Sequence, residues 1–89
     1  MCVLVADSPS PACLRGVTAG GAFLETNARP ELGALVDLHH PEAGLIAAVV
    51  RAHRLDGIEV DFPSAGPAIA FALATLAADM TGMVQQPPA

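Results

Sequence analysis

Gly16-Val17-Thr18-Ala19-Gly20-Gly21-Ala22-Phe23-Leu24 is the most informative stretch of this chain, because it combines a glycine pair with apolar alternation. Gly20 and Gly21 can supply positive φ angles, so we expect them to break one strand and to start the next. From Gly21 to Thr26, Phe23 falls on one face and its two apolar neighbours fall on the other. The stretch therefore predicts two strands joined by a glycine turn.

Gly57-Ile58-Glu59-Val60-Asp61-Phe62 alternates strictly between apolar and acidic residues. Asp56-Gly57 directly precedes this alternation and is a strong hairpin signal. The pattern predicts a half-buried strand in which Glu59 and Asp61 face water and the three apolar side chains point inward.

The strand that precedes the glycine turn is Ala12–Thr18, and the rest of the chain supplies three further strands and a helix. We expect these strands at Cys2–Ala6, Gly33–His39 and Leu45–Arg54, with turns at Asp7–Pro11 and Pro41–Gly44. From Ser64 the pattern becomes helical, over about residues 65–81. The sequence thus predicts a mainly β protein: a small antiparallel six-stranded barrel with a C-terminal α-helix, in one domain over residues 1–83, and a disordered tail over residues 84–89.

The expected helix is apolar nearly all round. Ile69, Leu73, Leu76, Met80 and Met83 form one stripe at spacings of four and three residues, and Phe71 with many alanines covers the other side. One face should pack on the barrel, and the other requires a partner or deeper burial. We expect a protein partner or a homodimer to contact the helix through Ile69, Phe71, Leu73, Leu76 and Met80.

Composition and charge exclude several classes of function. The 89 residues contain four arginines and no lysine, and the formal net charge is −5, which disfavours general binding to nucleic acid or anionic lipid. The apolar run over residues 65–78 is shorter than the roughly 20 residues that span a bilayer. No signal peptide is recognisable, so we expect a cytoplasmic protein with reduced Cys2 and Cys13.

The candidate metal and catalytic groups are sparse. His39 and His40 are adjacent on an expected strand, so they should point to opposite faces and cannot easily share one ion. Cys13 has no recognisable base or orienting group for nucleophilic catalysis. We expect neither a metal site nor an enzyme.

Four segments, in this order and at these gaps, resemble the bacterial PilZ domain family over roughly Cys2 to Met80. They are Val17–Leu24, Leu32–Leu38, Ile46–Arg51 and Gly57–Phe62. Some members of this family bind cyclic di-GMP, and others are relatives that have lost this ligand. Its ligand-binding members carry an Arg-x-x-x-Arg arm and an Asp/Asn-x-Ser-x-x-Gly motif, because planar guanidinium groups fork onto phosphate and guanine acceptors.

The ligand motifs of the family are degraded in this sequence. No Arg-x-x-x-Arg occurs, Gly16 stands at the acid/amide position, Thr18 replaces the serine, and Gly21 keeps the glycine. The resemblance then implies a vestigial, weak ligand site at Arg15, Thr18, Gly20 and Gly21, and no resident cofactor. It implies a non-catalytic adaptor of cyclic di-GMP signalling that acts through protein contacts. The alternative is a genuine cyclic di-GMP receptor whose missing arginines come from a partner chain.

Overall fold

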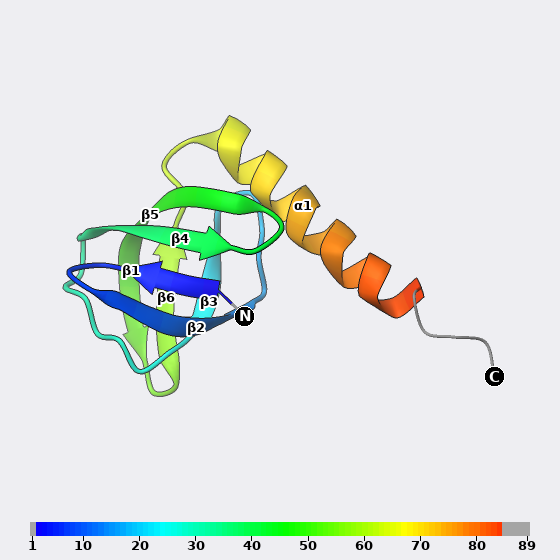
Figure 1. Cartoon of the computed structure of the whole chain (residues 1–89). Coiled ribbons are helices and arrows are strands. Elements are labelled where there is room, and N and C mark those ends of the chain that lie inside the picture. Colours follow the sequence, from blue (N-terminus) through cyan, green and yellow to red (C-terminus); the bar gives the residue numbers. More distant parts are fainter. Residues whose placement is uncertain (1, 85–89) are drawn as a thin grey trace.

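The computed structural model describes residues 2–84, with side chains described as far as Ala78. Six strands form a closed antiparallel barrel that is followed by one helix (Figure 1). The elements are β1 (Cys2–Val5), β2 (Pro9–Arg15), β3 (Gly21–Glu25), β4 (Leu35–His40), β5 (Gly44–Arg54), β6 (Gly57–Asp61) and α1 (Ala65–Val84). The strands pair in the order β1-β2-β3-β6-β5-β4, and pairing of β1 with β4 closes the barrel. The predicted barrel with a C-terminal helix is confirmed.

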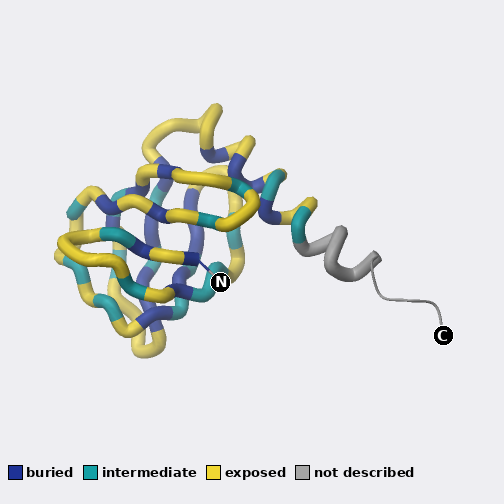
Figure 2. The backbone as a smooth tube through the Cα atoms, in the orientation of Figure 1, coloured by how far each residue is buried: buried dark blue, intermediate teal, exposed yellow. Residues whose placement is uncertain are grey.

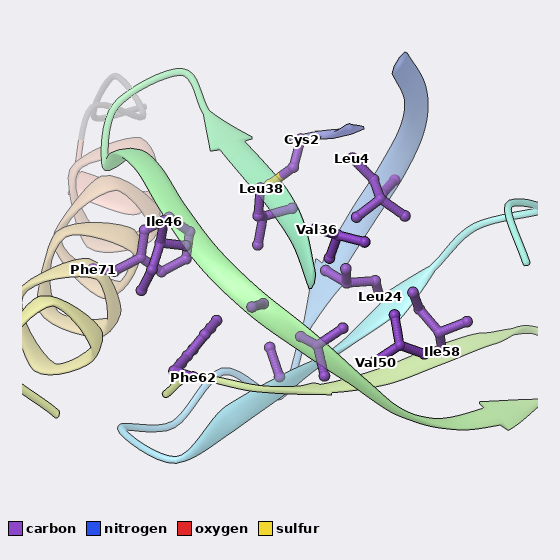
Figure 3. Close-up of a cluster of buried hydrophobic side chains, with 14 of the residues drawn as sticks. Cys2, Leu4, Leu24, Val36, Leu38, Ile46, Val50, Ile58, Phe62 and Phe71 are labelled. Atoms are coloured by element: carbon purple, nitrogen blue, oxygen red, sulfur yellow. The ribbon is translucent and has the colours of Figure 1, made fainter. Parts of the chain in front are cut away.

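Alternation along the strands places one set of side chains inside the barrel. In β4, Val36 and Leu38 are buried while Leu35, Asp37 and His39 are exposed. Figure 3 shows how side chains from several strands meet in the interior. The largest fully buried members are Leu4, Leu24, Leu38, Val50, Ile58 and Val60. The core is therefore mainly aliphatic, with Phe62 and Phe71 as its aromatic members, in a chain that has three phenylalanines and neither tyrosine nor tryptophan.

Strand β2 lies three residues earlier than predicted, and it contains two prolines. Pro9 pairs with Val5 and Pro11 with Val3, whereas pairing with β3 begins only at Cys13. The Thr26 hydroxyl donates to the Pro11 carbonyl oxygen at 2.8 Å, so this side of β2 faces the end of β3. The proline nitrogens thus lie beyond the β2–β3 ladder, where no N–H group is required.

The chain leaves β2 at Gly16, which has a φ of 59°. The expectation of positive φ at Gly20 and Gly21 was wrong, because among the described residues only Gly16, Gly33 and Gly44 have positive φ. A left-handed residue is needed where the strand turns away from the sheet, and that point comes at Gly16.

Helix α1 lies across one end of the barrel and closes it. Its Phe71 ring packs edge-on against Phe62, with ring centroids 5.8 Å apart, and against His40 at 6.0 Å. Ala68, Ala72 and Thr75 are buried beside it. Figure 3 shows Phe71 next to Ile46 at the barrel end.

The barrel contact corrects one residue of the predicted partner surface. Phe71 is only 3% exposed and belongs to the chain's own core, since the open barrel end needs a large apolar side chain to fill it. Ile69, Leu73 and Leu76 remain 49%, 62% and 49% exposed, respectively. Figure 2 shows buried and exposed positions alternating along the first turns of the helix. The Met80 side chain lies outside the described residues.

The helix bounds also differ slightly from the prediction. Helix α1 continues to Val84 rather than ending near residue 81, and Gly82 does not stop it. Residues 85–89 of the predicted tail lie outside the described residues. Within residues 2–84, no helix meets the combined length and hydropathy needed to cross a bilayer.

Candidate functional site

The predicted ligand turn is held together by the side chain of Thr18. The Thr18 hydroxyl accepts hydrogen bonds from the N–H groups of Gly20 and Gly21 at 3.2 Å each, and it lies 3.2 Å from the Gly21 carbonyl oxygen. The Thr18 N–H donates to that same carbonyl at 2.8 Å. The polar groups that a ligand would approach are therefore already engaged within the turn.

Gly21 has a packing role that is independent of any ligand. A Cβ atom on Gly21 would lie 2.2 Å from the carbonyl oxygen of Val60 on β6. Real Cβ atoms do not approach a carbonyl oxygen so closely, so only glycine fits at this end of the β3–β6 ladder. The glycine that the family motif shares with this chain is thus explained by the approach of two backbones.

An open cavity of about 400 Å³ lies beside the turn. Its walls bring together three of the four predicted ligand residues, namely Thr18, Gly20 and Gly21, and add Gly16, Ala22, Phe23, Arg51 and Glu59. Arg15 is not among the lining residues. Its guanidinium instead pairs with the Glu25 carboxylate at 2.6 Å.

The cavity contains a cation that the sequence reasoning did not assign to it. The guanidinium of Arg51 pairs with Glu59 at 2.7 Å and with Asp61 at 3.1 Å, and Arg54 also binds the Glu59 carboxylate. These pairs are exposed, so each contributes little to stability. Hydrogen bonds from Arg54 and then Arg51 lower the pKa of Glu59 below its usual value.

Arg51 reaches this cavity because of an irregularity in the β5–β6 ladder. Val50 pairs with Val60 and Ala52 pairs with Glu59, which leaves Arg51 as the extra residue of a bulge. Uninterrupted pairing from the hairpin would place Arg51 opposite Val60, on the inner face. Alternation counted from the buried Ile46, Ala48 and Val50 places Arg51 on the outer face, whereas a count from the hairpin does not, so the two counts disagree. A further signal is that the acidic residues Glu59 and Asp61 require outward-facing cationic partners.

A larger open cavity of about 540 Å³ lies where the β2–β3 ladder ends. Its lining includes Cys13, Glu25, Thr26 and Asp56. The Thr26 hydroxyl is satisfied by the Pro11 carbonyl, and Glu25 is satisfied by Arg15. Among the described side chains, no buried nitrogen or oxygen atom lacks a hydrogen-bond partner, so no unpaired buried group points into this cavity.

The remaining candidates are histidine and cysteine side chains. His40 Nδ1 accepts hydrogen bonds from the N–H groups of Glu42 and Ala43 at 3.1 and 3.0 Å, so this nitrogen fixes the β4–β5 turn. Cys2 and Cys13 are free thiols, and burial raises the pKa of Cys2. In the described part of the chain, no three His, Cys, Asp or Glu side chains are placed to hold a metal ion.

The structure defines the class as a small closed antiparallel β-barrel with a helix across one end. No family model matches the chain, and neither a curated protein nor a solved structure matches it.

Proposed function

We propose that this chain is a PilZ-like, non-catalytic regulatory or adaptor module of bacterial cyclic di-GMP signalling. In this proposal it acts in the cytoplasm through contacts with protein and does not bind the nucleotide itself. The resemblance of its four sequence segments and the architecture of a six-stranded barrel with a C-terminal helix support the assignment. The exposed apolar side chains of α1 supply a contact surface.

The observation that carries the proposal is the charge balance around the turn cavity. Arg15, Arg51 and Arg54 are each paired with a carboxylate, and the three carboxylates involved are Glu25, Glu59 and Asp61. A ligand with two phosphates needs free cationic donors, because its affinity depends on forked, charge-assisted hydrogen bonds. Here it would first have to displace carboxylates that already hold those donors.

A second candidate function is that of a cyclic di-GMP receptor. The observation in its favour is the cavity itself, which combines the Thr18–Gly21 turn with the guanidinium of Arg51. Separation of Arg51 from Glu59 and Asp61 would free one fork for a phosphate. The receptor would then depend on Arg51, a residue outside the degraded family motif.

Calorimetric titration of the purified chain with cyclic di-GMP separates the two functions. We expect no binding heat up to high micromolar ligand, since no unpaired guanidinium lines the cavity in the described residues. The matched control is the double variant Glu59→Gln and Asp61→Asn, which removes both carboxylates that pair with Arg51. Saturable heat in the original chain, abolished by Arg51→Ala, would overturn the adaptor proposal and establish the receptor.

A further inference from the structure

The exposed apolar residues of α1 follow the spacing of a coiled-coil seam. Ile69, Leu73 and Leu76 are separated by four and three residues, and the sequence continues this spacing at Met80 and Met83. A mean period of 3.5 residues is the a/d pattern by which one helix packs along another. We call these five positions the seam.

The barrel leaves much of the described seam exposed, although Leu76 also lines an open cavity of about 390 Å³ with barrel residues that include Leu14 and His40. The residues of α1 that pack on the barrel are Ala68, Phe71, Ala72 and Thr75, and none of them belongs to the seam. All three described seam residues are about half exposed or more. Figure 1 shows the later turns of α1 projecting past the barrel.

The charge pattern indicates which kind of partner fits the seam. No charged residue occurs between Asp61 and Asp79, and Ala70 and Ala77, which flank the seam, are small and exposed. Eight of the nine carboxylates and all four arginines precede residue 62, so the barrel carries a net charge of −4 and Asp79 supplies the remaining negative charge. An acidic or basic partner gains no ion pair between Ile69 and Leu76, whereas an identical helix meets a surface that is equally uncharged there and equally spaced.

We infer that α1 pairs with α1 of a second copy of this chain along the seam, giving a two-fold symmetric dimer. The inference rests on the proposed function, because it names the partner of the same helix surface. The seam is only about two heptads long, so the interface is small and the dimer reversible, with a dissociation constant in roughly the micromolar range.

Sedimentation velocity of the full chain over a concentration series tests the pairing. Interference optics are required, since the chain has neither tryptophan nor tyrosine. Leu73→Glu places a charge at the centre of the seam, and Ala74→Glu adds the same charge to the neighbouring residue off the seam. We expect the original chain and Ala74→Glu to form dimers, and Leu73→Glu to associate at least about tenfold more weakly. Far-UV circular dichroism of both variants establishes that each is folded.

Three outcomes would overturn the pairing. They are a monomer at every concentration, equal dimerisation of the folded Leu73→Glu and original chains, and a dimer broken by Leu45→Glu on the outer wall of β5 instead. The nucleotide titration separates this inference from the proposed function. A monomer with no nucleotide binding overturns the dimer alone, whereas a seam-dependent dimer that binds cyclic di-GMP overturns the proposed function alone.

Discussion

Gly57 lies where two strands approach too closely for a side chain. A Cβ atom there would lie 2.0 Å from the carbonyl oxygen of Leu24 and 2.9 Å from the Phe23 ring. Gly57 opposes Glu25 at one end of the β3–β6 ladder, and Gly21 opposes Asp61 at the other. Neither glycine has a positive φ, so both are required by the close approach of two strands rather than by a special backbone conformation.

Replacement of Gly57 by alanine should therefore destabilise the barrel. We expect Gly57→Ala to lower the free energy of unfolding by about 1–3 kcal/mol, because the methyl group forces two backbones apart. Gly20→Ala is the matched control, since its Cβ would meet nothing closer than the Thr18 hydroxyl at 3.8 Å. Denaturant titration followed by far-UV circular dichroism measures both. Equal stability of the two variants would contradict the steric explanation.

Glu59 gives the barrel a specific sensitivity to acid. Its pKa is lowered by hydrogen bonds from Arg54 and Arg51, so the folded state favours the ionised form. This contribution is present above the ordinary pKa of 4.5 and is lost as the pH falls through the lower folded value. We expect Glu59→Gln to be less stable than the original chain at pH 7, with a difference that shrinks progressively below about pH 4.5.

Thermal unfolding at a series of pH values measures this effect. Glu42→Gln is the control, because in the described residues the Glu42 side chain makes no ion pair. Its stability should follow that of the original chain at every pH. A Glu59→Gln difference that stays constant between pH 7 and pH 3 would show that the carboxylate does not stabilise the fold through its charge.

At the level of single elements, the alternation of apolar and polar residues predicted the strands that bury one face in the core. Strand β6 has the predicted inward and outward residues, and β4 alternates in the same way, because burial of one face imposes a period of two. Strand β2 was misplaced, because its prolines read as a turn. Pro9 and Pro11 are tolerated where the partner strand has ended, and this depends on the length of β3, which no local pattern specifies.

The candidate site was predicted only in part, for a similar physical reason. The positions of Thr18, Gly20 and Gly21 around one cavity follow from their closeness in sequence. Arg51 joins them from the outer face of β5, and its place opposite Glu59 and Asp61 depends on a bulge in the β5–β6 ladder that no local pattern specifies. The prediction wrongly placed Phe71 on the partner-facing surface of the helix. All sides of the helix are apolar, so periodicity could not show which side meets the barrel.

At the level of the whole molecule, closure of the barrel and placement of the helix depend on contacts between distant segments. Val3 and Leu4 in β1 pair with His39 and Leu38 in β4, and no sequence pattern predicts this pairing. The helix then covers the end of the barrel where Phe62 leaves β6 and His40 ends β4. The structure thus depends on a helix in which Phe71 is the one large buried side chain among the residues described as far as Ala78, and the barrel core and the helix should unfold together.

Truncation of Phe71 tests this coupling. We expect Phe71→Ala to cost about 3–5 kcal/mol of unfolding free energy, because it leaves a cavity among Phe62, His40 and Ile46. For a domain with a total stability of about 5–15 kcal/mol, that is a large fraction, and it should appear in one cooperative transition. Phe23→Ala removes the same atoms from a partly exposed site on β3 and should cost clearly less. If Phe71→Ala instead melted the helix in a separate early transition and left the barrel transition unchanged, the helix would be an independent appendage rather than part of the core.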